Sequence, residues 1–179
     1  MESPGRGYRE SGKATKGQDL SGSDYVSAKL SVRDSVSAPI IITATLAVDT
    51  RGEGFFEITS AAAEFLKGIE AGDGVILLFM RHTSASLVIQ ENADPDVRTD
   101  LVTALRRLAP ENTDWVHTVE GPDDMPGHVK SMLAGISLHV PVIGGKPALG
   151  TWQGIYVAEH RARPHRREVI LQFIGAKKA

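Results

Sequence analysis

The C-terminal part of the chain reads as three strands in close succession, at residues 137–143, 149–160 and 167–174. Each segment is rich in apolar and β-branched side chains, and glycine, proline or charged residues separate it from the next. Connections this short suit antiparallel strands, because a parallel pair needs a crossover of about a dozen residues or more. The pattern therefore predicts an α+β fold with a mixed, largely antiparallel sheet, and it disfavours a doubly wound parallel fold.

Upstream of these strands, apolar and helix-forming segments alternate irregularly. Residues 39–48 and 55–59 read as two strands of a hairpin, and the unbroken apolar run 75–80 reads as a strand buried on both faces. A further strand is expected at 86–90. Helices are expected at 60–69 with Thr59 or Ser60 as cap, at 94–110 with Asp94 as cap and Pro95 in the first turn, and at 128–135.

Residues 1–35 differ in composition from the rest of the chain. They are rich in glycine, serine and charges of both signs, and poor in large apolar side chains. Such a segment buries too little surface to offset its conformational entropy. We therefore expect a disordered N-terminal extension at 1–35, followed by one compact domain at 36–179.

Composition narrows the classes of function. The chain has no cysteine, so disulfides, thiolate metal sites and cysteine nucleophiles are excluded. Its formal net charge of −2 provides no basic field for nucleic acid or an anionic membrane. The longest apolar run is far shorter than the ~20 residues of a spanning helix, and no secretory signal is evident. These features predict a soluble, cytoplasmic protein that binds neither nucleic acid nor membranes.

Polar and ionisable side chains gather in three stretches. The first, RHTSASLVIQENADPDV, begins directly behind the apolar run and contains His82, Ser84, Glu91 and Asn92. In an extended chain His82 and Ser84 face the same way, since side chains alternate with a period of two. The end of a strand is a common place for functional groups. The alternative is structural: His82 completes a strand end, and the acids serve the start of the following helix.

The second stretch, WVHTVEGPDDMPGHVK, carries His117 and His128 in or beside an irregular acidic segment. Together with His82 they offer three imidazoles from different parts of the chain, and imidazole suits zinc, nickel or iron. No pair of these histidines has the i, i+4 spacing of a helical metal motif, so spacing by itself supports the metal site only weakly.

The third stretch is GTWQGIYVAEHRARPHRR. If Trp152 packs inward, then Thr151, Gln153 and Glu159 share the opposite face of a strand. A basic loop follows, and a loop of this kind could clamp a phosphate or a carboxylate. A solvated hairpin tip is the alternative. The arginines in question are Arg161, Arg166 and Arg167.

A Ser-His-acid hydrolase is disfavoured by the sequence. Ser84 or Ser86 could be paired with His82, but the chain has no G-x-S-x-G elbow. Residues two apart on one strand also rarely align a base with its neighbour's hydroxyl.

Four motifs in order resemble the YjbQ-like family of secondary thiamine-phosphate synthase enzymes: RHTSASLVIQENADPDVRTDL, EGPDDMPGHVKSMLAGISL, ALGTWQGIYVAEHR and RREVILQFIG. The resemblance runs from about Ile40 to Gly175. It implies a single compact α+β domain, with a largely antiparallel β-sheet sandwich and a few helices, that assembles as a homotrimer. It also implies a polar cleft near subunit boundaries, a small phosphorylated substrate and a divalent metal, Zn or Mg.

The resemblance and the residue types together indicate roles for individual side chains. The catalytic candidates are His82, Ser84, Glu91, Asn92, Gln153 and Glu159. The candidates for substrate or anion binding are Lys130, Thr151, Arg161, Arg166 and Arg167. The candidate metal ligands are His82, His117 and His128, and the acids that could face a metal are Glu91, Asp94, Asp96 and Asp124. The loop RARPHRR departs from the family pattern, with Pro164 and His165 in place of glycines.

Three functions follow as hypotheses. The first is a metal-assisted transferase that joins an aminopyrimidine diphosphate to a thiazole phosphate and releases pyrophosphate. The second is a metal-dependent hydrolase of a small phosphorylated metabolite, and the third is a non-catalytic trimer that binds a metal or ligand. The chain lacks a recognisable diphosphate-binding loop, which favours a metal site with anion contacts over the named reaction.

Overall fold

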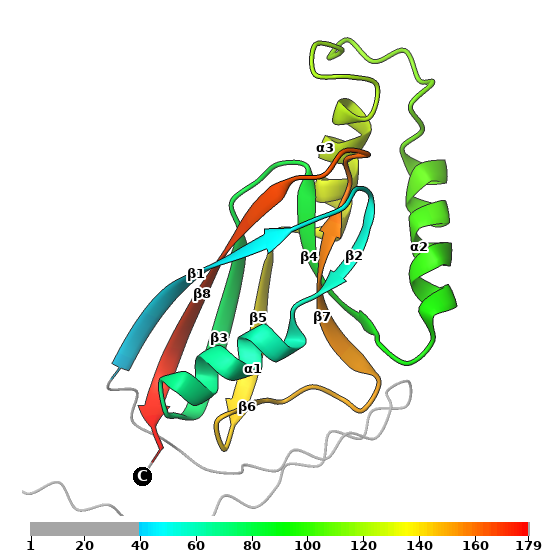
Figure 1. Ribbon diagram of the computed structural model, residues 1–179. Coiled ribbons are helices and arrows are strands. Elements are labelled where there is room, and N and C mark those ends of the chain that lie inside the picture. The colour runs from blue at the N-terminus through cyan, green and yellow to red at the C-terminus, as the bar shows by residue number, and fades with distance from the viewer. Residues whose placement is uncertain (1–39, 179) are drawn as a thin grey trace, which may run out of the picture. The chain divides into compact units, whose positions relative to one another are not determined.

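The computed structural model describes residues 40–178. The predicted N-terminal extension at 1–35 and the start of the predicted domain therefore lie outside the described residues. Strands and helices are arranged as Figure 1 shows. The strands are β1 (Ile40–Asp49), β2 (Gly54–Glu57), β3 (Ala71–Met80), β4 (Ala85–Glu91), β5 (Ser137–Ile143), β6 (Lys146–Pro147), β7 (Gln153–Glu159) and β8 (Arg166–Lys177). The helices are α1 (Thr59–Gly68), α2 (Pro95–Leu108) and α3 (Asp124–Ala134).

The strands form two antiparallel sheets. The larger sheet has the order β1-β8-β3-β5-β6, and the smaller has the order β2-β7-β4. Every strand pairing within residues 40–178 is antiparallel. The predicted α+β class and the largely antiparallel pairing are thus confirmed, and the described part contains no parallel pair.

Strand β8 runs through the larger sheet between β1 and β3. Its burial alternates along the strand, with Val169, Leu171 and Phe173 facing the core. This period of two is what a sheet with one buried face requires. Because a slip of one residue would turn the apolar side chains outward, burial fixes the register of β8 against both neighbours.

Strands β3 and β8 approach closely where Gly74 lies opposite Gly175. A Cβ atom at Gly74 would lie 2.7 Å from the Cα of Gly175 and 2.9 Å from the Phe173 ring. A Cβ atom at Gly175 would lie 2.8 Å from the Cα of Gly74. Larger residues do not fit here without a backbone shift, so this crossing depends on glycine at both positions.

The hairpin predicted for the first two strands is wrong. Strand β1 pairs with β8 and β2 pairs with β7, so the turn between β1 and β2 joins two different sheets. The three C-terminal strands are likewise antiparallel to their partners but not partners of one another, since β5 and β8 flank β3 while β7 lies in the smaller sheet. Strand pairing in this fold follows the burial of apolar faces, which brings together strands that are distant in the sequence.

Strand β3 is buried mainly on one face, not on both as its apolar run predicts. Ile76, Leu78 and Met80 are at most 1% exposed, whereas Phe79 is 41% exposed. A run that is apolar on both sides does not reveal which side the core will cover.

Helix α2 begins as predicted. Asp94 is its N-cap, and the Asp94 Oδ1 accepts a hydrogen bond from the Asp96 N–H at 2.9 Å, with Pro95 in the first turn. The structure therefore confirms that Asp94 serves the start of the helix, because its carboxylate accepts a hydrogen bond from a backbone donor there.

The other two helices begin differently from the predictions. At α1 the N-cap position is Ile58, and the Thr59 hydroxyl donates to Glu57 Oε1 and accepts from the Ile155 N–H. The predicted cap is wrong because this hydroxyl links α1 to β7 instead. Helix α3 begins at Asp124, one turn before the predicted start.

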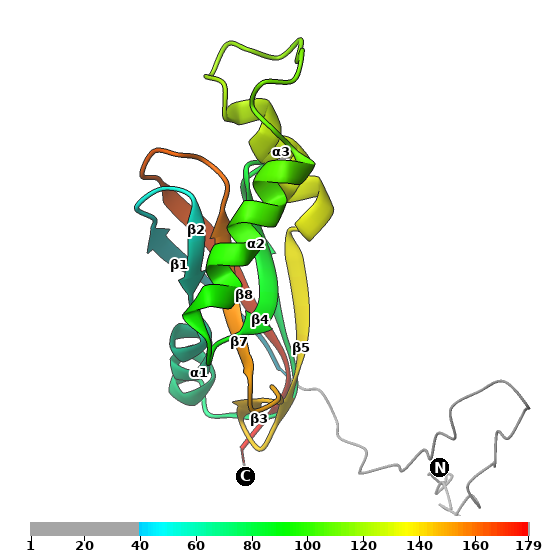
Figure 2. The ribbon, with the colours of Figure 1, turned by 90° about the vertical axis from the view of Figure 1, so that its right-hand side faces the viewer.

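One apolar core joins the two sheets and α1. Helix α1 covers one end of the domain, and α2 lies on the side of the smaller sheet that faces away from the larger one (Figures 1 and 2). No residue of α2 is fully buried. The core side chains that are fully buried include Leu66, Ile76, Leu78, Met80, Leu87, Ile155, Val157, Val169 and Phe173.

Candidate functional site

Two histidines and an aspartate meet at the start of α3. His117 lies in the segment before the helix, Asp124 is its first residue, and His128 follows one turn later on the same face. One nitrogen or carboxylate oxygen of each residue lies within 4.8 Å of those of the other two. Metal bonds to nitrogen and oxygen are about 2.0–2.2 Å long, so small side-chain rotations would bring all three atoms onto one ion.

The backbone orients the ring of His128. Its Nδ1 lies 3.0 Å from the carbonyl oxygen of Thr83, and because a carbonyl oxygen can only accept, Nδ1 carries the proton. In the neutral ring, Nε2 then presents a lone pair 3.4 Å from the Oδ2 of Asp124. Two acceptors at this distance repel each other unless a proton or a metal ion lies between them. A bond from the second ring nitrogen to a carbonyl is also usual for metal-bound histidine.

The same carboxylate oxygen faces His117. The His117 Nε2 lies 2.6 Å from Asp124 Oδ2. The aspartate side chain is 2% exposed, whereas the side chains of His117 and His128 are 44% and 33% exposed. The cluster therefore has protein on one side and an open side toward solvent.

Arg161 holds the other oxygen of Asp124. Its Nη1 donates to Asp124 Oδ1, its Nε donates to Asp123 Oδ2 at 3.2 Å, and its Nη2 donates to the Glu120 carbonyl at 2.7 Å. The Glu120 carboxylate also lies 3.8 Å from this guanidinium. Three carboxylates thus surround one guanidinium, which leaves a formal charge of −2 (three negative against one positive) before any cation binds.

Asp123 and Arg161 stay ionised at neutral pH. Burial raises the pKa of Asp123, but the Ala162 N–H and the Arg161 guanidinium outweigh this effect and keep the pKa below its usual value. Burial lowers the pKa of Arg161, but its bond to Asp123 and the nearby charges of Asp123 and Asp124 outweigh burial. The pKa of Arg161 is therefore above its usual value. Asp123 therefore carries a negative charge near pH 7, paired with the positive charge of Arg161.

A buried ion pair occupies the adjoining ends of β7 and β8. The Nε and Nη2 of Arg167 donate to the two carboxylate oxygens of Glu159 at 2.7 and 2.6 Å. Thr50 Oγ1 donates to Glu159 Oε2 at 2.9 Å, and Arg167 Nη2 donates to Ser84 Oγ at 3.2 Å. Burial raises the pKa of Glu159, but the Arg167 guanidinium, the Arg161 N–H and the Thr50 hydroxyl hold it below the usual value. Three predicted site residues, Ser84, Glu159 and Arg167, thus satisfy one another inside the fold.

A second buried polar pair joins Ser86 and His160. The Ser86 Oγ lies 2.8 Å from His160 Nε2, and the two residues are 0% and 2% exposed. Burial, followed by the charge of Lys130, lowers the pKa of His160 to about 4. The ring is neutral at pH 7 and closed off from solvent, so a substrate in solution has no access to this pair.

His82 lies near His128 but outside the group with metal-ligand spacing. Its Nε2 accepts the N–H of Glu168 at 3.0 Å. Burial, followed by the charge of Arg167, lowers the pKa of His82. His82 and His128 both line a small pocket of about 320 Å³. Among the described residues, the group with metal-ligand spacing contains Asp124, whereas the sequence predicted His82 as the third ligand. Ligation by His82 stays a prediction.

The remaining polar candidates lie at the end of β4 and β7 that is distant from Glu159 and Arg167. The register pairs Glu91 with Gln153 at one end of these strands, and Ala85 with Glu159 at the other. Six residue steps at about 3.3 Å each separate the two ends by about 20 Å. Within one chain, the far-end set therefore does not reach the His-Asp-His cluster; this set is Glu91, Asn92, Thr151 and Gln153.

The cations predicted to bind an anion each have a carboxylate partner. Lys130 is buried, and its Nζ lies 2.6 Å from Glu53 Oε1. Arg166 lies at the surface, 3.3 Å from Asp49 Oδ1. With the pairings of Arg161 and Arg167 described above, none of these four side chains is left without a counter-charge in the described structure.

Sequence reasoning missed the pairing of Asp124 with His128. These residues do have i, i+4 spacing, but the predicted helix began at His128, so the acid was placed outside it. Extending the helix by one turn would have revealed the pair. The tertiary structure brings His117 and the Thr83 carbonyl to the cluster, and no local sequence pattern predicts that they meet there.

No helix within residues 40–178 is long and apolar enough to cross a lipid bilayer.

The fold and the site together define a class: an α+β domain of two antiparallel sheets with a His-Asp-His cluster at the start of its third helix. A family model described as UPF0047 protein YjbQ-like matches residues 44–176. The chain therefore belongs to the UPF0047, or YjbQ-like, family, as its motifs indicated.

Relatives and solved structures agree with this assignment. A UPF0047 protein of Synechocystis is 45% identical over 131 residues, which cover 73% of this chain and 89% of the relative. The UPF0047 protein YjbQ of Salmonella typhimurium is 40% identical over 73% of this chain and 96% of its own length. The crystal structure of a hypothetical protein from Aeropyrum pernix is similar with a TM-score of 0.70 at 28% identity, covering 75% of this chain and 99% of that one.

Proposed function

We propose that the protein is a metal-dependent enzyme that hydrolyses a small phosphorylated metabolite at the cluster of His117, Asp124 and His128. The observation that carries this proposal is the orientation of His128. Its Nδ1 donates to the Thr83 carbonyl, and its Nε2 faces the Asp124 carboxylate at 3.4 Å. A cation between these two atoms would turn a repulsion into two favourable bonds, and a donor set of two imidazoles and one carboxylate suits zinc.

The open side of the cluster favours catalysis over a purely structural metal site. Structural zinc sites are closed by four protein ligands, whereas catalytic ones have three and leave a position for water or substrate. The described cluster offers three ligand atoms, and both histidines are partly exposed. A divalent ion supplies Lewis-acid chemistry, since it polarises a phosphoryl oxygen and makes water more acidic.

The chain's own residues hold the cluster in shape. Arg161 holds Asp124 from behind through Oδ1, which leaves Oδ2 directed at both histidines. The Thr83 carbonyl keeps the proton of His128 on Nδ1 and frees Nε2 as a donor atom. Such outer partners orient ligands and sharpen metal affinity.

The ion pairs of the predicted anion-binding cations favour hydrolysis of a phosphate ester over transfer of an aminopyrimidine group. The thiamine-phosphate synthase reaction implied by the resemblance releases a diphosphate, whose developing charge requires stabilising cations. In the described structure Lys130, Arg161, Arg166 and Arg167 are each committed to carboxylates. A single phosphate can instead be bound by the metal itself, so a phosphate ester is the substrate class that we put forward.

The experiment uses tag-free protein, stripped with chelator and reloaded with zinc, manganese or magnesium. It is assayed against a panel of small phosphate esters and against the aminopyrimidine diphosphate and thiazole phosphate pair. We expect metal-dependent phosphate release that His128→Ala abolishes and His139→Ala, a surface histidine on β5, leaves unchanged. Thiamine phosphate formation with the same dependence would establish the transferase instead. Stoichiometric metal binding without turnover on either set would establish the non-catalytic alternative.

The homotrimer and the cytoplasmic location expected from the sequence belong to the same proposal. The two polar sets about 20 Å apart on β4 and β7 support an assembly, because a neighbouring copy could bring the Glu91–Gln153 end of one chain to the cluster of another. Sedimentation equilibrium should give three times the mass of the chain. A mixture of His128→Ala and Gln153→Ala proteins should recover activity that each lacks alone, and a monomer would rule this arrangement out.

A further inference from the structure

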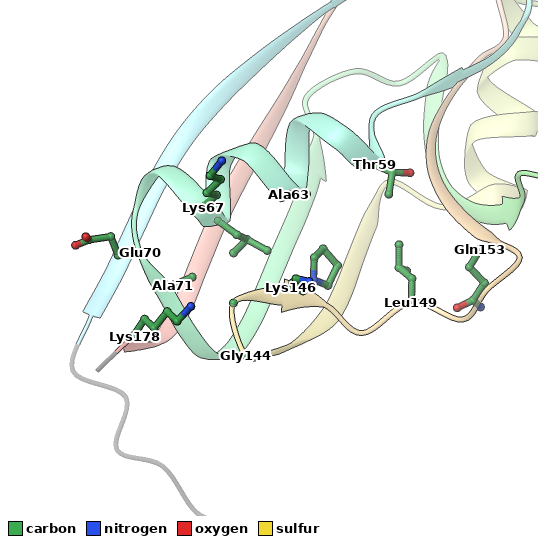
Figure 3. A pocket seen from close by; sticks show the side chains of 13 residues that line it. Thr59, Ala63, Lys67, Glu70, Ala71, Gly144, Lys146, Leu149, Gln153 and Lys178 are labelled. Carbon is green, nitrogen blue, oxygen red and sulfur yellow. The ribbon is translucent and has the colours of Figure 1, made fainter.

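A cavity at one end of the domain lies far from the His-Asp-His cluster within one chain. It has a volume of about 820 Å³, is open to solvent on one side, and is lined by α1, by the β5–β6 turn with the segment after it as far as Gln153, and by the residue after β8 (Figure 3). Helix α1 and strand β6 lie at one end of the domain, while α3 lies at the other (Figure 1). Pockets for small molecules typically measure about 300–1,000 Å³, so this cavity has the size of a ligand site.

The interior of the cavity is largely apolar. Ala63 and Leu66 line it from α1, and Pro147 and Leu149 line it from the opposite side. Leu66 is fully buried in the core, and Leu149 packs against the core. An apolar ligand group placed here would lose its contact with water and would be favoured by about 25 cal/mol for each Å² buried.

The wall formed by the β5–β6 turn is fixed in place. Gly144 and Gly145 both have positive φ angles, 58° and 79°. The Gly144 N–H donates to the Asp73 carboxylate at 2.6 Å, and the Gly145 N–H donates to the Gly72 carbonyl at 3.2 Å. These two bonds tie the turn to the start of β3 and hold this wall of the cavity in position.

The charged side chains that line the cavity are mostly positive. Lys67 comes from α1, Lys146 from β6 and Lys178 from the residue after β8, against one acid, Glu70 (Figure 3). Within residues 40–178 no ion pair includes any of these three lysines. The acid Glu70 lies 4.0 Å from Lys177, which does not line the cavity. Three lysines against one glutamate leave a formal charge of +2 around an apolar space.

From this combination we infer that the cavity binds a small amphipathic anion, a molecule with an apolar body and one carboxylate. The apolar body lies between α1 and Pro147 and Leu149, and the carboxylate lies at the rim among the lysines. Ammonium groups attract a carboxylate over several ångströms at the edge of a low-dielectric space, so charge selects the anion and the apolar walls select the body. Within one chain this site lies apart from the His-Asp-His cluster, although Gln153, at the end of β7 that the proposed assembly brings to a neighbouring cluster, also lines it.

The test uses octanoate as the probe and calorimetry on the full-length protein. We expect saturable binding of one octanoate per chain. Octylammonium, which has the same apolar chain and the opposite charge, should bind at least tenfold more weakly. The triple variant Lys67→Gln, Lys146→Gln, Lys178→Gln should lose at least tenfold in octanoate affinity, while Lys177→Gln, a neighbouring lysine outside the cavity, should match the wild type.

Three outcomes would overturn the inference. Equal affinity for octanoate and octylammonium would mean that the lysines play no part in selection. Unchanged affinity in the triple variant would place the ligand elsewhere on the protein. Absence of saturable octanoate binding in a folded protein would mean that the cavity takes another occupant, such as part of a second copy of the chain. Circular dichroism of each variant confirms that the fold is intact before affinities are compared.

Discussion

The Nδ1 of His128 donates to the carbonyl oxygen of Thr83, 3.0 Å away, and this bond decides which ring nitrogen faces Asp124. The bond directs Nε2 toward the carboxylate and makes His128 the best-oriented donor of the cluster. A metal ion that binds here should therefore depend strongly on this side chain.

Removal of His128 or of the Asp124 carboxylate should weaken metal binding strongly. We expect His128→Ala and Asp124→Asn each to weaken zinc affinity by about 100-fold or more, because each removes one of the three available ligand atoms. Competition with a chromophoric chelator measures the affinity, and His139→Ala serves as the matched control. Wild-type zinc affinity in His128→Ala would contradict the assignment.

Replacement of Arg161 should affect the metal indirectly. Arg161→Lys keeps the positive charge but loses the fork that contacts both Asp123 and Asp124. We expect a loss of zinc affinity of about 10- to 100-fold, the usual effect of removing an outer partner of a ligand. The surface variant Arg166→Lys, on a residue paired with exposed Asp49, is the control and should bind zinc as the wild type does.

The buried pair of Glu159 and Arg167 should stabilise the fold through mutual neutralisation. Arg167→Met leaves the Glu159 carboxylate, whose side chain is 0% exposed, without its main partner. Breaking a buried pair in this way typically costs about 3–5 kcal/mol in the free energy of unfolding. Urea denaturation measures this cost. The double variant Glu159→Gln, Arg167→Met should lose less than the sum of the single variants, and strictly additive losses would show that the two side chains are not coupled.

His160 should make the protein sensitive to mild acid. Its pKa of about 4 in the folded state lies below the unfolded value of 6.5, so the unfolded chain binds more protons between these values and stability falls as the pH drops through this window. Between pH 7.5 and pH 5 this one residue should lower the free energy of unfolding by about 2 kcal/mol.

Denaturation of wild type and His160→Gln at both pH values isolates this effect. The variant should show a smaller difference between the two pH values by about 2 kcal/mol, because glutamine does not titrate. An equal difference in both proteins would mean that His160 titrates normally in the folded state. Comparing the change with pH, not the absolute stability, removes the cost of the lost bond to Ser86.

The close approach of β3 and β8 should reject any side chain at Gly74. Gly74→Ala places a Cβ 2.7 Å from the Cα of Gly175, and overpacking of this kind costs about 1–3 kcal/mol in stability. Gly68→Ala is the control: this helical glycine has nothing within 4 Å of its Cβ position, and alanine there should be neutral or stabilising by up to about 1 kcal/mol. Equal unfolding midpoints for the two variants would contradict the packing described.

Local patterns in the sequence determined much of the secondary structure. The apolar alternation of β8, the cap and proline of α2 and the positions of β4 and β5 are encoded within a few residues of themselves, since each depends on periodicity or on a bond between near neighbours. The motifs also identified the family, and they singled out His117 and His128 before any geometry was known.

Tertiary structure alone decided which of these pieces meet. The sequence does not show that β1 pairs with β8 and not with β2, because pairing depends on where apolar faces are buried across the whole chain. For the same reason, Gln153 and Glu159 are close in sequence yet lie about 20 Å apart along an extended strand, whereas Thr83 and His128 are far apart in sequence and lie in hydrogen-bond contact. The sequence specified the chemical groups of the site, and the long-range packing of strands and helix determined which of them share it.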